Sequence, residues 1–131
     1  MFRNIIISIS VLLLLFTLSY AQEASLTITG MSAEPATVSP GGKALISCRV
    51  SHPGGPMSIE RVAATVIHGD VVSVYPKLYD DGTHGDKVSD DGIYSSEIKA
   101  ANTAGESKIT FHAVDTSKNE INSEPIILTI K

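Results

Sequence analysis

The chain has 131 residues, of which 43% are hydrophobic and 18% charged. This length is enough for one ordinary domain, and this hydrophobic fraction excludes a wholly disordered chain. The 14 acidic residues outnumber the 10 basic ones, which gives a formal net charge of −4. Because no basic run is present to contact phosphates, we expect no nucleic-acid partner.

The first 21 residues have the three parts of a secretory signal peptide. Arg3 supplies a positive charge, residues 5–18 are mostly apolar, and residues 19–21 form a small-x-small cleavage site. The apolar run is shorter than the roughly 20 residues that a membrane-spanning helix needs. We therefore predict a signal peptide over 1–21, no membrane span after its removal, and a secreted or periplasmic domain over 22–131. The alternative is an uncleaved N-terminal anchor.

Short β-rich runs separated by turn residues follow the predicted signal peptide. None has a helical period, whereas several alternate apolar and polar residues with the period of a half-buried strand. The predicted strands cover residues 25–29, 43–51, 59–68, 71–79, 93–99, 108–114 and 125–131. This pattern predicts an all-β fold, an immunoglobulin-like or fibronectin type III-like sandwich of about seven antiparallel strands.

Single residues refine this prediction at three strands. Gly30 is expected to end the first strand. Pro76 lies inside the fourth run and lacks a backbone N–H, which favours an edge strand or a bulge there. The C-terminal run, by contrast, is short, apolar and uninterrupted, so under the alternative of a surface assembly it is an unprotected edge strand that would pair with a neighbour.

Cys48 is the single cysteine, so an internal disulfide is excluded. It alternates with Ala44, Ile46 and Val50 along the second predicted strand. We interpret it as a small buried hydrophobic residue of the core. The alternatives are an intermolecular disulfide and a reactive thiol.

Residues 80–92, DDGTHGDKVSDDG, are rich in acidic residues and glycine. Carboxylates and loop carbonyls together supply the roughly six to eight oxygens that Ca²⁺ binds. The candidate metal ligands are Asp80, Asp81, Asp86, Asp90 and Asp91. Their spacing does not match an EF-hand, and Asp-Gly pairs also favour plain turns. Three interpretations stay open: a turn network without metal, a calcium-stabilised loop, and a catalytic carboxylate pair.

Residues 78–98 resemble a recurrent signature, L-x-D-D-G-x-x-x-D followed by D-G-x-Y-[ST]. The matching positions are Leu78, Asp80, Asp81, Gly82, Asp86, Asp91, Gly92, Tyr94 and Ser95. The signature is typical of immunoglobulin-like and fibronectin-like modules of secreted and surface proteins, mainly bacterial and archaeal. A similar string occurs in the extracellular sandwich domain of calcium-activated chloride channel regulators.

The resemblance extends over about residues 24–131. Residues 111–115, FHAVD, followed by Asn119, are similar to the penultimate strand and turn of these modules, with Lys118 where a glycine is usual. The resemblance implies the fold. It implies no particular activity, because such modules are mostly accessory or linking domains with varied ligands.

We expect a non-catalytic exported module for binding, adhesion or assembly, with an unidentified protein or surface partner. No nucleophile elbow, P-loop or dinucleotide fingerprint is present. Carbohydrate binding through Tyr75 and Tyr79 is not favoured, since Tyr79 and Tyr94 are expected to pack beside the acidic loop. The alternatives are a small secreted enzyme or inhibitor using that loop or residues 52–56, and a subunit of a surface assembly that pairs through an edge strand.

Overall fold

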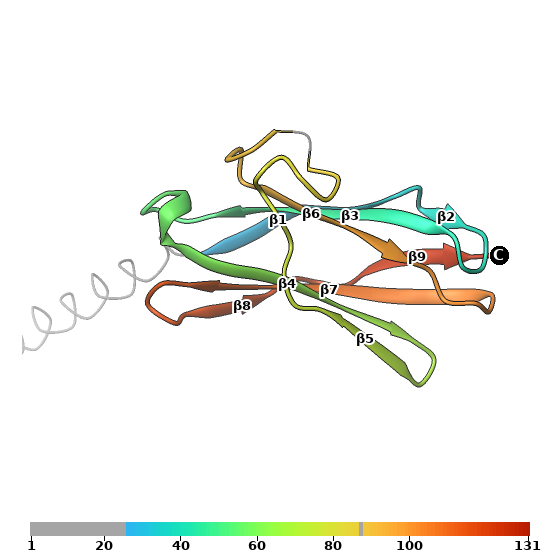
Figure 1. Cartoon of the computed structure of the whole chain (residues 1–131). Coiled ribbons are helices and arrows are strands. Elements are labelled where there is room, and N and C mark those ends of the chain that lie inside the picture. The colour runs from blue at the N-terminus through green and yellow to red at the C-terminus, as the bar shows by residue number, and fades with distance from the viewer. Residues whose placement is uncertain (1–25, 87) are drawn as a thin grey trace, which may run out of the picture.

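The computed structural model describes residues 26–86 and 88–131, so the predicted signal peptide lies outside the described residues. These residues form two β-sheets that face each other, and among them there is no α-helix, only the 3-10 turn Pro56–Ser58 (Figure 1). The predicted all-β architecture in two sheets is therefore confirmed. In this part of the chain no helix has the length and the apolar character that a membrane crossing requires.

The smaller sheet is antiparallel and contains β1 (Thr27–Glu34), β3 (Lys43–Ser51) and β6 (Ile93–Lys99), in that order. The larger sheet has the order β2-β9-β7-β4-β5, with β8 also paired to β7. Its strands are β2 (Thr37–Val38), β4 (Ile59–His68), β5 (Val71–Tyr75), β7 (Gly105–Asp115), β8 (Glu120–Asn122) and β9 (Ile126–Ile130). All its pairs are antiparallel except β2 with β9.

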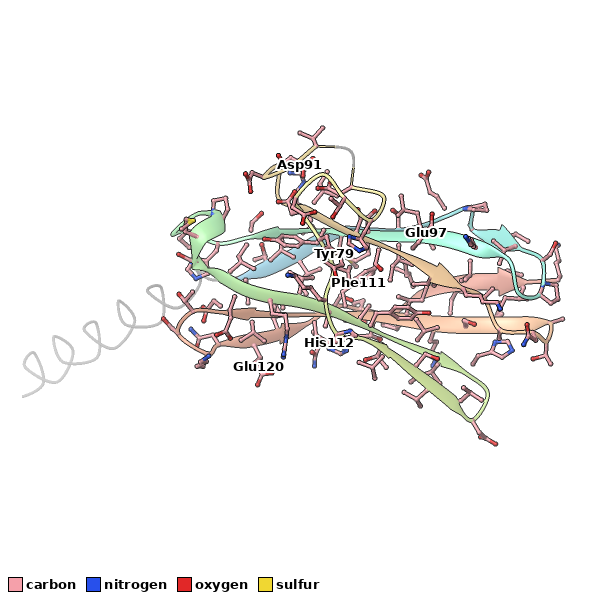
Figure 2. All side chains as sticks on the ribbon, in the orientation of Figure 1. Tyr79, Asp91, Glu97, Phe111, His112 and Glu120 are labelled. Carbon is pink, nitrogen blue, oxygen red and sulfur yellow. The ribbon has the colours of Figure 1, made fainter. Side chains whose placement is uncertain are left out.

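The hydrophobic core lies between the sheets and is built from alternate residues of the strands. Phe111, which is fully buried, lies in the space between the two sheets in Figure 2. Ile109 and Ala113, on the same face of β7, are also fully buried, as the period-two pattern predicts. Cys48 is 0% exposed on β3, among the buried residues of the core. Its predicted place in the core is confirmed.

The first strand continues past Gly30, so the expectation that this glycine ends it is wrong. Thr29 pairs with Arg49 and Ser32 pairs with Ser47, which leaves β1 with one extra residue between the two pairs. Gly30 has a φ of 59°, the left-handed conformation that a glycine supplies in this type of β-bulge. The glycine therefore bends the strand without terminating it.

The edges of the larger sheet also differ from the expectation. β9 lies between β2 and β7, so the C-terminal strand is an interior strand and not the open edge. The fourth predicted strand is an edge, as Pro76 suggested, but β5 ends at Tyr75, before the proline. The segments that form β2 and β8 were not predicted. They have two and three residues, too few to show a period.

After β5 the chain crosses from the larger sheet to the smaller one. The N–H of Leu78 donates to the carbonyl of Val62 on β4 at 2.7 Å. Tyr79 and Ser95 on β6 exchange backbone hydrogen bonds of 2.9 Å in both directions. Two consecutive residues thus join the two sheets, and they set the position at which residues 80–92 begin.

Candidate metal centre in the Asp/Gly loop

Three of the five candidate carboxylates converge at the outer side of the smaller sheet. One oxygen each from Asp80, Asp86 and Asp91 lies within 4.8 Å of the other two. Asp80 is 9% exposed and Asp86 is 6% exposed, which is unusual for acidic side chains. Figure 2 shows Asp91 on the loop that stands on this sheet. We call Asp80, Asp86 and Asp91 the aspartate cluster.

Backbone amides hold the carboxylate of Asp80 at the base of the loop. Its Oδ2 accepts the N–H of Gly92 at 2.9 Å, and its Oδ1 accepts the N–H of Asp91 at 3.2 Å. Its main-chain carbonyl accepts the N–H of Asp90 at 2.8 Å. Asp80 therefore ties the beginning of the loop to its end, as Asp residues do in turns.

The other two members of the aspartate cluster are held in the same way. Asp86 accepts the N–H of Gly82 at 2.9 Å, and Asp91 accepts the N–H of Ile93 at 2.9 Å. Each carboxylate of the cluster thus keeps at least one backbone donor. The turn network expected from the Asp-Gly pairs is present, and it is this network that brings the three carboxylates together.

The structure places the two remaining candidates outside the aspartate cluster. Asp81 is exposed and its Oδ1 accepts both the backbone N–H and the hydroxyl of Thr83, which is an Asx-type turn. Asp90 is exposed at the turn before β6 and has a φ of 59°. The two hydrogen bonds from Thr83 hold the side chain of Asp81 away from the aspartate cluster. Nothing in the spacing of the acidic residues along the sequence distinguishes Asp81 from Asp80.

The carboxylates of the cluster affect each other's protonation. The pKa of Asp80 is raised to about 6 by burial first and by the neighbouring Asp91 carboxylate, against the opposing effect of the backbone amides of Gly92 and Asp91. The hydrogen bond from the N–H of Ile93 lowers the pKa of Asp91, with smaller contributions from Asp80 and Arg49. Like charges this close favour a shared proton or a bound cation.

The donor set of the aspartate cluster fits a hard cation. Carboxylate oxygens are the ligands that Ca²⁺ prefers, and its flexible geometry tolerates loop carbonyls and water at the remaining positions. A divalent ion would neutralise two of the three negative charges of the cluster. The same residues could instead share a proton, which is the arrangement of a catalytic carboxylate pair.

A hollow of about 450 Å³ opens beside Asp80, between the loop and β4. Arg61, Lys77, Tyr79 and Tyr94 contribute to its lining. This size lies within the range of roughly 300–1,000 Å³ that is usual for small-molecule sites.

Tyr79 and Tyr94 lie close to the acidic loop. The ring of Tyr79 stacks on the imidazole of His84, with centroids 3.6 Å apart and planes inclined by 10°. Lys77 Nζ lies 5.1 Å from the centroid of the same ring. Tyr75 lies apart from this group, on the edge strand β5. The face of Tyr79 that His84 covers is therefore not a platform on which a sugar could stack.

A second polar group surrounds Asp115, a residue for which the sequence predicts only the end of a strand and a turn. This residue is 2% exposed, and its Oδ1 accepts the N–H groups of Ser117 and Asn119 at 2.9 and 2.8 Å. Its Oδ2 accepts Asn119 Nδ2 at 3.0 Å and His52 Nε2 at 3.2 Å. These hydrogen bonds, that of the Asn119 side chain first, lower the pKa of Asp115.

His52 and Asp115 form a pair of the kind found in catalytic triads, but both nitrogens of this imidazole are engaged. Nδ1 accepts the N–H of Gly54 at 2.9 Å, so the ring proton of the neutral form is on Nε2 and is donated to Asp115. No ring nitrogen is then left to take a proton from a nucleophile. The pair instead joins the loop before β4 to the turn after β7.

No protein-family model matches this chain, and no curated protein sequence matches it either.

Proposed function

We propose that this protein is a non-catalytic exported module for binding, adhesion or assembly, of the immunoglobulin-like or fibronectin type III-like type, whose Asp/Gly loop is stabilised by Ca²⁺. The order of the strands in the two sheets supports the immunoglobulin-like or fibronectin type III-like type. β1-β3-β6 corresponds to the A-B-E sheet of such domains, and β9-β7-β4-β5 to G-F-C with an added C′ edge. Residues 1–21 support export.

The calcium site is proposed because the three carboxylates of the aspartate cluster lie close together. Asp80 and Asp86 are almost fully buried, and burying two carboxylates side by side is costly without a balancing charge. A divalent cation supplies that charge. Because the cluster spans the loop that connects β5 to β6, the bound ion would stabilise the link between the two sheets.

Two observations support the absence of catalysis. The carboxylates of the cluster already accept hydrogen bonds from the backbone of their own loop. His52, the histidine that contacts a buried carboxylate, uses both ring nitrogens to hold the 52–56 loop. In each case the acid–base groups maintain a turn, which is a structural task.

Thermal unfolding of the purified exported protein in chelator and in millimolar Ca²⁺ tests the calcium site. An ion present at 100 times its dissociation constant adds about 2.7 kcal/mol of apparent stability. We expect this gain for the natural protein and for Asp81→Asn, which removes an acidic side chain of the same loop outside the cluster. We expect Asp86→Asn combined with Asp91→Asn to abolish it. Equal melting temperatures with and without Ca²⁺ in the natural protein would falsify the calcium site.

Intact-mass measurement of the same preparation tests export, since cleavage at the predicted site leaves Gln22 as the first residue. A chain that retains residues 1–21 contradicts a cleaved signal.

The hollow beside Asp80 favours one second candidate, a small secreted enzyme that uses the acidic loop. In such an enzyme Asp80, whose pKa is raised to about 6, would act as the general acid, and Arg61 and Lys77 would contact an anionic substrate. A hydrolase screen comparing the natural protein with Asp80→Asn discriminates the two functions. Turnover that the substitution removes would overturn the non-catalytic proposal.

A further inference from the structure

Ser95 is a buried residue on the outer face of the smaller sheet. It lies on β6 and is 3% exposed. The next residue, Ser96, pairs with Ile46 of the core, so Ser95 points to the opposite, outer face. Glu97 lies on the same outer face and is exposed. Ser95 differs because Tyr79 pairs with its backbone, and the acidic loop that follows stands over this part of the sheet (Figure 1).

The hydroxyl of Ser95 has no hydrogen-bond partner among the described residues. Six polar or charged residues are buried in this part of the chain, and each of the other five has a side-chain hydrogen bond. No described side-chain oxygen that is sealed from solvent lacks a partner, so the Oγ of Ser95 keeps a small opening. Because a buried hydroxyl without a partner is costly, a water molecule or an ion is expected to complete its environment.

Ser95 lines a second hollow, of about 310 Å³, which lies between the acidic loop and the smaller sheet. We call it the sheet-side hollow. The polar side chains among its described lining residues carry only carboxylates and hydroxyls: Ser32, Glu34, Ser47, Asp86, Asp91 and Ser95. No positively charged side chain is among these residues, so the sheet-side hollow favours a cation over an anion.

The two members of the aspartate cluster that line this hollow each keep an uncommitted oxygen. Asp86 accepts the N–H of Gly82 through Oδ2, and Asp91 accepts the N–H of Ile93 through Oδ1. No N–H or hydroxyl group of the described residues donates to Oδ1 of Asp86 or to Oδ2 of Asp91. Both oxygens, like the hydroxyl of Ser95, are therefore available to a cation.

We infer that a Ca²⁺ ion bound by the aspartate cluster lies on the side of the sheet-side hollow, and that Oγ of Ser95 is one of its ligands. The inference rests on the calcium site of the proposed function and adds to it a residue of the sheet. Ca²⁺ takes neutral oxygens beside carboxylates, and serine hydroxyls bind hard divalent cations in other proteins. The ion then joins the loop, through Asp86 and Asp91, to β6, through Ser95.

Calorimetric titration with Ca²⁺ and thermal unfolding of Ser95→Ala test the ligand. The substitution removes the hydroxyl and adds no bulk. We expect the dissociation constant for Ca²⁺ to rise about tenfold or more. In chelator we expect an unchanged melting temperature, because this hydroxyl has no protein partner to lose. A side chain that merely held the loop would show the reverse, a loss of stability in chelator.

Ser47→Ala is the matched control. Ser47 pairs with Ser95 on the neighbouring strand and lines the same hollow, but its Oγ lies 2.9 Å from Oγ of Ser32 in a hydrogen bond. We expect Ser47→Ala to leave the dissociation constant for Ca²⁺ unchanged. Its melting temperature in chelator should fall slightly, since a hydrogen bond is lost.

Two spectroscopic measurements test direct contact between Ser95 and the ion. Tb³⁺ replaces Ca²⁺ at oxygen sites, and its luminescence decay in H₂O and in D₂O counts the water molecules bound to it. We expect about one more bound water in Ser95→Ala than in the natural protein, and the natural number in Ser47→Ala. Ser95→Cys should bind Cd²⁺ with a sulfur-to-metal charge-transfer band, because thiolate is a soft ligand. The natural protein should lack the band, since Cys48 is fully buried.

The outcomes separate this inference from the proposed calcium site. A natural protein that binds neither Ca²⁺ nor Tb³⁺ contradicts the calcium site and the inference together. Binding that Ser95→Ala leaves unchanged contradicts the role of Ser95 alone. Weaker binding with the natural number of bound waters also overturns that role, because Ser95 would then act on the loop and not on the ion. If Ser95→Ala does not fold, the Cd²⁺ band of Ser95→Cys decides, and its absence overturns the inference.

Discussion

His52 Nε2 and Asp115 Oδ2 lie 3.2 Å apart although 63 positions separate the two residues in the chain. The contact joins the loop between β3 and β4 to the turn between β7 and β8. Because Asp115 also accepts two backbone N–H groups of its own turn, it is the common acceptor for both segments.

Removing either partner of this contact should destabilise the protein, but not equally. His52→Ala removes the hydrogen bond to Asp115 and the one accepted from the exposed N–H of Gly54, which together lower the free energy of unfolding by about 1–2 kcal/mol. Asp115→Ala leaves the donors of Ser117, Asn119 and His52 without their acceptor, so its loss is larger. Urea unfolding of the two variants measures the difference. A smaller loss for Asp115→Ala would contradict the role of Asp115 as the shared acceptor.

In chelator, stability should rise on mild acidification because of Asp80. Its pKa is raised to about 6 in the folded protein, so the folded state binds the proton more tightly than the unfolded state. The free energy of unfolding therefore increases as the pH falls from about 7 to about 5. Below about pH 4 it decreases again, because Asp91 and Asp115 have lowered pKa values and lose their stabilising contribution on protonation.

Asp80→Asn isolates the contribution of Asp80 to this pH dependence. The amide side chain keeps a hydrogen-bond acceptor and carries no charge, so the rise between about pH 7 and about pH 5 should disappear. The decrease at lower pH should stay. Guanidinium unfolding at three pH values measures both, and an unchanged rise in the variant would show that another group titrates.

Gly85 should tolerate alanine less well than Gly55. Both glycines have left-handed φ values, 88° and 84°, so alanine is strained at each by roughly 1–2 kcal/mol. A Cβ on Gly85 would also clash with Cδ1 of Leu45, whereas a Cβ on Gly55 meets nothing within 4 Å. Gly85→Ala should therefore cost about 1–3 kcal/mol more than Gly55→Ala. Equal losses in thermal unfolding would mean that Leu45 moves aside freely.

The thiol of Cys48 should not react in the folded protein. It is fully buried, and burial raises its pKa to about 12, so almost no thiolate forms at neutral pH. A chromogenic disulfide reagent should leave the native protein unlabelled and label it fully in guanidinium. Rapid labelling of the native protein would instead support the reactive thiol, the alternative that the sequence left open.

The strands that could be predicted are those whose signal is local. The bounds of β3, β4 and β6 agree with the predicted runs 43–51, 59–68 and 93–99, because alternation and flanking turn residues lie within the segment itself. β2 and β8 depend on pairing with β9 and β7, which are distant in the sequence. The expectation for Gly30 is wrong because a single glycine in the sequence is equally compatible with the end of a strand and with a β-bulge.

The sequence predicted the segment that contains the candidate site. The tertiary structure decided which residues of that segment form the site. Composition alone identified residues 80–92 as an acidic turn region, since five carboxylates with glycines at their sides are a local property. Which carboxylates converge depends on the chain path. The contacts of residues 78 and 79 with both sheets set where the loop begins, and Thr83 holds Asp81 outside the cluster.

By itself the sequence determined the β-rich class and the acidic loop, and it predicts a signal peptide, because charge, hydropathy and period are read along the chain. The tertiary structure decided which strands of the described residues lie at the sheet edges. The C-terminal strand has the composition of an edge available for pairing, yet β2 and β7 flank it, and β5 is left exposed instead. The neighbours of a strand are set by hydrogen bonds between segments that lie far apart in the chain. The residue pattern within the strand does not show which segments these are.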